Sequence, residues 1–159
     1  MLVGSDYTLV YNVLSFGTAV MFGAFVYFLT QMKSVSKQYQ AGIAVSAIVV
    51  GIAGYHYYRI WSDFGEGVMN EGYRYADWLI TVPLLIVELL IVLGVAQKDR
   101  TSLMLKLVPA SILMIGLGYP GEVADGNGAK WTFWILALIP FAYILKTLYD
   151  ELQKAGQRE

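Results

Sequence analysis

The chain has 159 residues, of which 57% are hydrophobic and 14% are charged, and its formal net charge is -1. An average soluble domain is about 45–50% apolar and about 25% charged, so this composition favours a membrane protein. The near balance of 11 basic and 12 acidic residues excludes an electrostatically driven nucleic-acid binder. Because the chain has no cysteine and a single histidine, His56, disulfide scaffolds, thiol catalysis and cysteine or multi-histidine metal sites are excluded.

Five apolar segments are long enough to cross a bilayer, because a transmembrane helix needs about 20 mostly apolar residues. Polar linkers, several of them containing glycine or proline, separate these segments. We therefore predict an all-α membrane protein in which residues 1–159 form a single transmembrane domain. The five predicted spans, in chain order, cover residues 8–32, 40–61, 73–95, 102–119 and 131–152.

Basic side chains lie in the linkers 33–37 and 97–101 and near the C-terminus, whereas the linkers 63–72 and 120–130 are mainly acidic. The basic side chains are Lys33, Lys37, Lys98, Arg100, Lys106, Lys146, Lys154 and Arg158. Loops rich in lysine and arginine stay on the cytoplasmic side of a membrane. We expect a multi-pass protein of the cell (inner) membrane, with its N-terminus outside and its C-terminus in the cytoplasm.

The third segment carries two carboxyl groups, Asp77 and Glu88, inside its apolar stretch. Their spacing of eleven residues is close to three helical turns, which places them on one face, roughly 16 Å apart along the axis. Arg74 and Thr81 share that face with Asp77 at positions i-3 and i+4. Ionisable groups at membrane depth are costly and usually mark a transport pathway. This helix is therefore the candidate functional element.

The predicted orientation gives the two acids different roles. Asp77 lies nearer the outside, where the Arg74 guanidinium favours an ionised acceptor, and Glu88 lies nearer the inside, where apolar surroundings favour a neutral reservoir. This arrangement is typical of an outward proton relay. The alternative is that both acids only form hydrogen bonds between helices.

His56 lies in the outer half of the second segment, near the expected depth of Asp77. A histidine–aspartate pair would tune the proton acceptor across the physiological pH range. The alternative is a histidine bonded to a backbone carbonyl. Arg59 is interpreted as a side chain that reaches out to the interface, and the surrounding aromatic residues as an interfacial belt. The belt comprises Tyr57, Tyr58, Trp61, Tyr73 and Tyr75.

Residues 74–88, which read RYADWLITVPLLIVE, closely resemble the third helix of microbial rhodopsins. The resemblance is to the proteorhodopsin- and xanthorhodopsin-like group of light-driven proton pumps, and it covers the whole chain. Residues 54–57 (GYHY) resemble the second helix of that group, residues 114–122 the fourth helix and its loop, and residues 134–145 the fifth. By this resemblance, the chain corresponds to the first five helices of a seven-helix bundle.

The resemblance implies roles for the polar residues. Asp77 would be the counter-ion and primary proton acceptor, and Glu88 would be the proton donor that completes, with Thr81, the Asp-Thr-Glu pattern of proton pumps. His56 would partner Asp77, and Arg74 would help to poise the exit of the proton. The cofactor implied is retinal. Its pocket would be lined by Trp78, Val82, Leu85, Met114, Gly118, Trp134, Ala137, Leu138 and Phe141.

The resemblance also implies a Schiff-base lysine on a seventh helix, and the five segments contain no lysine at mid-membrane depth. The seven lysines are Lys33, Lys37, Lys98, Lys106, Lys130, Lys146 and Lys154. Residues 150–154 imitate the family's Asp-x-x-x-Lys spacing, but their charged surroundings favour a solvated helix end. The covalent lysine is therefore expected outside this chain.

The function implied is that of a light-driven outward proton pump, which is not an enzyme, represented here without the helix that carries the lysine. A sensory rhodopsin is one alternative, and a truncated or split membrane fragment without photochemistry of its own is another. The expected partners are the lipid bilayer, protons, a complementary chain carrying helices six and seven, and further copies in a homo-oligomer. No nucleic-acid partner is expected.

Overall fold

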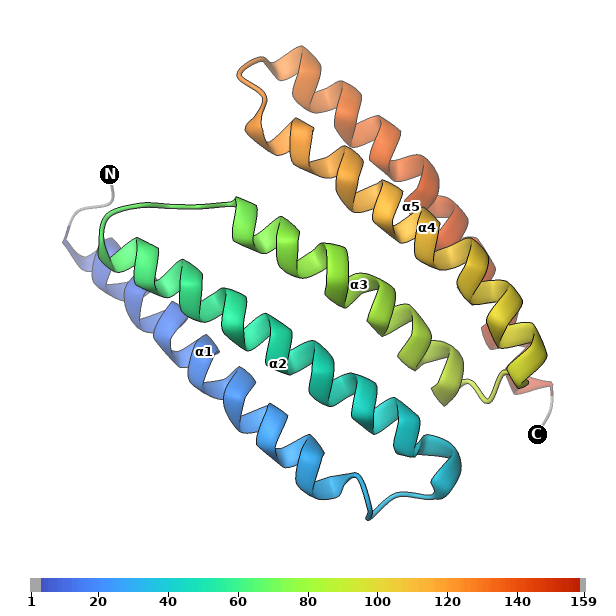
Figure 1. The fold of residues 1–159 in the computed structure, drawn as a ribbon. Helices are drawn as coiled ribbons and strands as arrows, with labels where there is room; N and C mark the ends of the chain where they lie inside the picture. Colours follow the sequence, from blue (N-terminus) through green and yellow to red (C-terminus); the bar gives the residue numbers. More distant parts are fainter. Residues whose placement is uncertain (1–3, 158–159) are drawn as a thin grey trace. The chain divides into compact units, whose positions relative to one another are not determined.

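The computed structural model describes residues 4–157, and regular structure in that range is entirely helical. The helices are α1 (Ser5–Gln31), α2 (Lys37–Gly65), α3 (Gly72–Val92), α4 (Gln97–Val123) and α5 (Asn127–Gly156), as Figure 1 shows. Each of the five is long and apolar enough to cross a membrane. The predicted all-α fold class and the five predicted spans are confirmed.

The helices extend beyond most of the predicted spans. Residues 97–101 and much of 120–130 were predicted as linkers but are helical, because α4 begins at Gln97 and α5 begins at Asn127. Hydrophobicity marks only the part of a helix that lies in hydrocarbon, whereas the backbone hydrogen bonds continue into the polar interface. The predicted linkers were therefore too long.

The third helix is the exception, because it ends at Val92 rather than at residue 95. Gly94 has a φ of 65°, which places it in the left-handed region that glycine adopts without strain. The backbone N–H of Gly94 donates to Ile91, and that of Val95 donates to Leu90. This is a Schellman cap, and the buried Val95 side chain packs with Leu90 beneath it.

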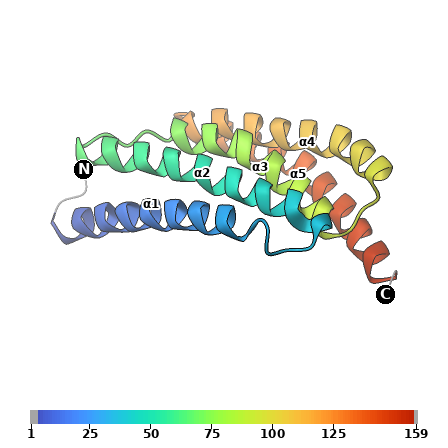
Figure 2. The ribbon, with the colours of Figure 1, turned by 60° about the horizontal axis from the view of Figure 1, so that its bottom comes forward.

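The described residues form two compact units, which comprise residues 4–81 and residues 82–157. In the first unit, α1 and α2 run antiparallel and side by side (Figure 2). Glycines of α2 permit this close approach: a Cβ atom at Gly54 would lie 3.2 Å from the Cβ of Met21, and one at Gly51 would lie 3.1 Å from the ring of Phe25. Small residues allow membrane helices to pack closely in this way.

In the second unit, α4 packs along α5, and the C-terminal part of α3 contributes to the same apolar cluster. The cluster consists of Ile86, Leu90, Val95, Leu107 and Ile144. One polar group, the fully buried Ser111 hydroxyl, donates to the Val108 carbonyl at 2.8 Å, which satisfies it within its own helix. The Ser111 hydroxyl therefore leaves no unsatisfied donor in this apolar cluster.

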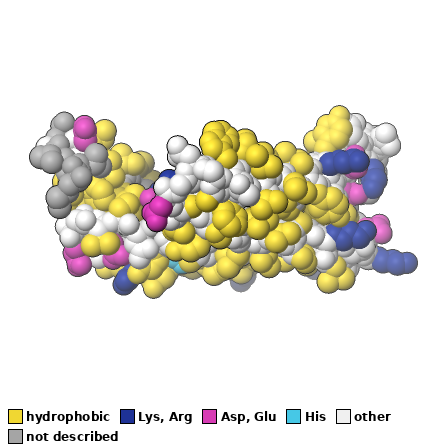
Figure 3. All heavy atoms as spheres, turned by 90° about the horizontal axis from the view of Figure 1, so that it is seen from above, with side chains coloured by type: hydrophobic (Ala, Val, Ile, Leu, Met, Phe, Trp, Pro, Cys, Tyr) yellow, Lys and Arg dark blue, Asp and Glu magenta, His cyan; other side chains and the backbone are white. Residues whose placement is uncertain are grey.

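The helices present apolar side chains outward. Hydrophobic side chains cover much of the face seen in Figure 3, and the charged side chains visible there lie mainly away from its middle. Many large apolar side chains are exposed, among them Phe16, Leu105 and Ile139. Such surfaces suit a hydrocarbon environment, so the chain is a multi-pass membrane protein.

The α1–α2 contact can be tested with a glycine pair. Gly54→Leu should destabilise the protein by about 1–3 kcal/mol, because the new side chain would push against Met21. Gly23→Leu is the matched control, since Gly23 is exposed in α1 and a Cβ there would meet nothing within 4 Å. Unfolding in mixed micelles with increasing dodecyl sulfate measures both. Equal stability of the two variants would contradict the close packing.

Candidate functional site

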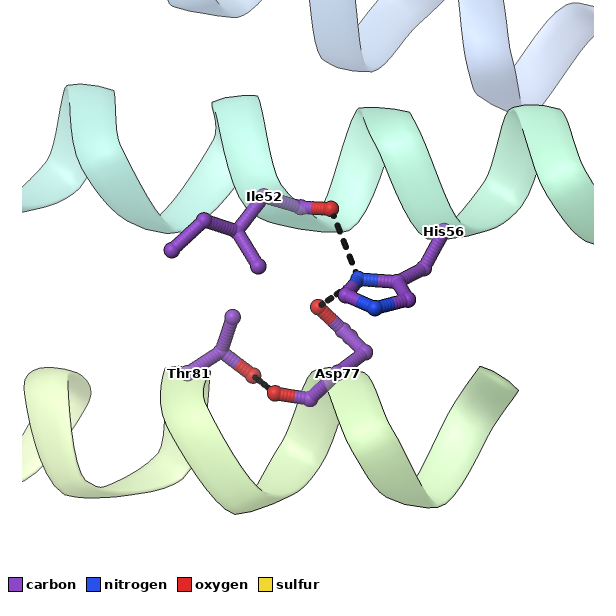
Figure 4. Close-up of polar contacts among 4 residues, drawn as sticks. All are labelled: Ile52, His56, Asp77 and Thr81. Carbon is purple, nitrogen blue, oxygen red and sulfur yellow. Dashed lines mark hydrogen bonds and ion pairs between the residues drawn. The ribbon is translucent and has the colours of Figure 1, made fainter. Parts of the chain in front are cut away.

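The candidate site joins α2 to the N-terminal part of α3, within the first unit. His56 Nδ1 lies 3.6 Å from Asp77 Oδ1 (Figure 4). Both side chains are largely withdrawn from the surface, with exposed fractions of 12% for His56 and 7% for Asp77. The two residues therefore lie together, which is one of the two arrangements that the sequence left open, at a distance that suits an ion pair but exceeds a hydrogen bond.

The histidine also bonds to its own helix. His56 Nδ1 is 3.0 Å from the carbonyl oxygen of Ile52, one turn earlier in α2. A carbonyl can only accept, so Nδ1 carries the hydrogen in this contact. The two interpretations that the sequence left open are thus both present: the backbone carbonyl holds the imidazole, and Asp77 lies beside the same nitrogen.

The Asp77 carboxyl group is incompletely satisfied. Its Oδ1 atom is buried and has no hydrogen-bond partner among the residues that the structure describes. Thr81 does not supply one, because its hydroxyl donates at 2.9 Å to the main-chain oxygen of Asp77. A buried carboxylate needs a cation or a proton. The geometry therefore suits a group that pairs with a positive charge or takes up a proton.

A second pair of residues extends the site, and sequence reasoning missed it. The Tyr73 hydroxyl accepts hydrogen bonds from Arg59 Nη2 at 2.7 Å and from Arg59 Nε at 3.2 Å. The Tyr73 ring also lies 6.5 Å from the His56 ring, centroid to centroid. Arg59 was interpreted as reaching out to the interface, and Tyr73 as part of the aromatic belt.

The spacing contained a signal for this second pair. Arg59 follows His56 by three residues, and Tyr73 precedes Asp77 by four, so each lies on the same helix face as its partner. Because α2 and α3 run antiparallel, a contact between His56 and Asp77 also brings Arg59 and Tyr73 together, one helical turn away. The four residues form a single polar seam between the two helices.

The predicted pairing of Arg74 with Asp77 is not the one that the structure contains. Arg74 Nη1 forms an ion pair with Glu71 Oε2 at 2.8 Å. Glu71 precedes the first turn of α3 and is more accessible than Asp77, so the long arginine side chain reaches outward to it. Both side chains are partly exposed, so this pair contributes little to stability. Its effect on Asp77 is at most indirect.

The remaining predicted residues lie in two places. Trp78 belongs to the first unit, and Glu88 lies half-buried on the part of α3 that belongs to the second. The other predicted retinal contacts are exposed or half-buried in the second unit, and their role stays a prediction. They are Val82, Leu85, Met114, Gly118, Trp134, Ala137, Leu138 and Phe141. Within residues 4–157, no group of three or more histidine or acidic side chains is placed to hold a metal ion.

Comparisons with known proteins agree on one family. A sequence model described as bacteriorhodopsin-like protein matches residues 8–159. A green-light absorbing proteorhodopsin from Gamma-proteobacterium EBAC31A08 is 35% identical over 135 residues, which are 83% of this chain and 53% of the relative. Archaerhodopsin-2 from Halobacterium sp. (strain aus-2) is 30% identical over 155 residues, 91% of this chain and 58% of the relative.

The similarity extends to solved structures. Xanthorhodopsin, described as a light-driven ion pump with dual chromophore, superposes with a TM-score of 0.93 at 40% identity and covers 99% of this chain. The chain covers 69% of that structure and about half the length of the curated relatives that it matches. The five helices match the first five helices of the rhodopsin fold.

The His56–Asp77 contact can be tested by a double-mutant cycle with His56→Phe and Asp77→Asn. We expect a coupling free energy of about 0.5–3 kcal/mol, because the two side chains share one contact. Unfolding in mixed micelles measures it. The matched cycle pairs His56→Phe with Thr81→Val, whose hydroxyl bonds only the main chain, and should give a smaller coupling. Equal couplings in the two cycles would contradict the pairing.

Proposed function

Because the chain belongs to the bacteriorhodopsin-like family, we propose that it forms part of a light-driven pump that moves protons outward across a membrane. The name of the proteorhodopsin relatives and the description of xanthorhodopsin as a light-driven ion pump support this proposal. Since the chain spans only part of those proteins, the proposal concerns the assembled pump.

The observation that carries the proposal is the state of Asp77. A carboxyl group in a membrane-spanning helix, with one buried oxygen that no described hydrogen-bond donor satisfies, is a poor structural element. It is a suitable proton acceptor, because a proton or a cation relieves the cost of burying it. His56 beside it supplies a second group that can hold positive charge.

The residues present fit retinal as a cofactor. Retinal, when bound, would supply a light-driven movement of positive charge, for which the unsatisfied Asp77 oxygen would be the matching counter-ion. In the first unit, the Trp78 side chain, next to Asp77 in the chain, would contribute an aromatic surface for a polyene, since such ligands bind between apolar walls. We propose that the covalent lysine comes from helices six and seven, provided by further sequence or by a complementary chain.

The proposed proton path follows α3. Asp77 takes up the proton, which neutralises its carboxyl group. His56 stays beside this carboxyl group because the Ile52 carbonyl holds the imidazole in place. The Arg59–Tyr73 pair continues the polar seam away from Asp77. Glu88, on the other side of Asp77 along α3, supplies the replacement proton. One helix thus carries both acceptor and donor.

The distribution of charge supports an orientation with the N-terminus outside and the C-terminus in the cytoplasm of a cell whose inner membrane holds the protein. Lys33, Lys98 and Arg100 would then face the cytoplasm. We propose that the assembled protein forms a homo-oligomer, for which the exposed apolar side chains supply surface.

The experiment adds all-trans-retinal to the 159-residue chain, alone and together with a polypeptide carrying helices six and seven of a relative. We expect a red-shifted band that hydroxylamine removes, and light-driven acidification outside the vesicles, only in the combined sample. Asp77→Asn should lose the acidification, because an amide cannot take up the proton. Asp125→Asn, an exposed aspartate between α4 and α5, is the matched control.

The other outcomes are equally informative. A band formed by the chain alone would mean that one of its own lysines reacts, and our account of the lysines would be wrong. A band without acidification would favour a sensory rhodopsin. No band in either sample would favour a fragment without photochemistry.

Glu88→Gln tests the donor. In the combined sample it should slow the recovery of the dark state by about 10-fold or more, on the scale of general acid–base effects, while leaving the absorption band nearly unchanged. Flash photolysis measures the recovery. Glu122→Gln, the same change at an exposed site near the end of α4, is the control. An unchanged recovery in Glu88→Gln would refute the donor role.

A further inference from the structure

The contact between His56 and Asp77 is not held by a hydrogen bond of its own. The two facing atoms lie 3.6 Å apart, which is longer than an N–H···O bond. The bond from His56 Nδ1 to the Ile52 carbonyl fixes the imidazole to α2, its own helix, and does not fix the position of the ring relative to α3 (Figure 4). The register of the two facing helix surfaces therefore depends on contacts outside this pair.

The contact between Arg59 and Tyr73 joins the same two helices through hydrogen bonds. The Tyr73 hydroxyl accepts from Arg59 Nη2 at 2.7 Å and from Arg59 Nε at 3.2 Å, and Arg59 Cζ lies 5.2 Å from the centre of the Tyr73 ring. Hydrogen bonds from a charged donor are stronger than those between neutral groups. Because both donors belong to one rigid, planar guanidinium group, they restrain the direction of the side chain as well as its reach.

Arg59 has this partner although an acidic side chain is available at helical spacing. Asp63 follows Arg59 by four residues in α2, and oppositely charged side chains at this spacing can form an ion pair. Within residues 4–157, the structure contains no ion pair between the two. The guanidinium group is thus directed across to α3 rather than along its own helix, which indicates that the contact with Tyr73 is a specific feature of the α2–α3 interface.

The Arg59–Tyr73 contact lies directly beside the proposed proton acceptor. Arg59 is about one turn from His56 in α2, and Tyr73 is about one turn from Asp77 in α3. The Tyr73 and His56 rings lie 6.5 Å apart, centroid to centroid. Residues one turn apart share a helix face, so a rotation of either helix that broke the Arg59–Tyr73 bonds would also move His56 or Asp77. The geometry of one contact therefore depends on the other.

We propose that Arg59 and Tyr73 are positioning residues, which hold α2 and α3 in the register that places His56 beside Asp77. This inference rests on the proposed function, in which Asp77 accepts the proton, because the acceptor then needs its partner at a fixed place. The inference itself concerns only the first unit, so it is tested on the chain without retinal and without pumping.

The single histidine of the chain gives the test a direct signal. The full chain, labelled with ¹⁵N-histidine and carrying a purification tag without histidine, is studied in micelles by NMR. The quantity measured is the difference in the His56 Nδ1 shift between Asp77 and Asp77→Asn forms, at the pH where it is largest. Tyr73→Phe, which removes the hydroxyl and keeps the ring, should lose at least half of this difference. Tyr58→Phe, the same change at an exposed site of α2, should keep it.

Two variants at Arg59 separate positioning from a general loss of structure. Arg59→Lys keeps the charge and one donating group, so it should retain more of the shift difference than Arg59→Gln does. Every variant is measured with and without Asp77→Asn, so that direct effects of a substitution on the His56 signal cancel. Circular dichroism checks that the helix content is unchanged.

The results that would overturn the proposal are specific to it. They are a full shift difference in Tyr73→Phe or Arg59→Gln, equal losses in Arg59→Lys and Arg59→Gln, or no difference between the unsubstituted chain and Asp77→Asn. None of these results depends on light-driven acidification in the combined sample. A failure of the acidification experiment would in turn leave the NMR result intact, so the two proposals fail separately.

Discussion

A carboxyl group inside a membrane-spanning helix is the constraint on which the rest of the first unit depends. The bilayer core offers no water to solvate Asp77, so the protein itself must supply whatever stabilises it. The structure supplies little: among residues 4–157, one carboxylate oxygen has no hydrogen-bond donor, and the Thr81 hydroxyl bonds the main chain instead. The imidazole of His56 at 3.6 Å is the main compensation. Asp77 is thus held in a state that a proton or a cation improves.

The surrounding residues hold the contact between His56 and Asp77 in place, but they do not satisfy all the hydrogen-bonding capacity of the Asp77 carboxyl group. The Ile52 carbonyl fixes the histidine ring through Nδ1, so the ring cannot turn freely towards Asp77. One turn away, the two hydrogen bonds between Arg59 and Tyr73 connect the same two helices. A carboxylate whose oxygens all accepted hydrogen bonds would be more stable, and it would gain less free energy from taking up a proton. The incomplete hydrogen bonding of Asp77 is therefore the observation that supports the proposed proton transport.

Hydropathy alone predicts most of the fold, because a 20-residue apolar stretch has few alternatives in a membrane. The two carboxyl groups of α3 and the His56–Asp77 proximity follow from helical spacing and orientation. A bond from His56 to a backbone carbonyl was one of the two interpretations of the sequence, but the sequence could not show that this bond and the Asp77 contact occur together. The direct partner of Arg74 could not be predicted, because helical spacing makes Asp77 and Glu71 equally near and only the path of the side chain favours Glu71.

The glycine contacts between α1 and α2 bear on how the molecule is made. These two helices leave the ribosome before α3, and their close antiparallel packing needs nothing from α3. His56 and its bond to Ile52 belong wholly to that hairpin. When α3 enters the bilayer, Asp77 therefore comes to lie beside an imidazole that is already held in position. A carboxyl group, which is costly to place in hydrocarbon, is thus inserted next to a side chain that can pair with it. The order of the helices in the chain thus makes a partner available to Asp77 as soon as α3 is inserted.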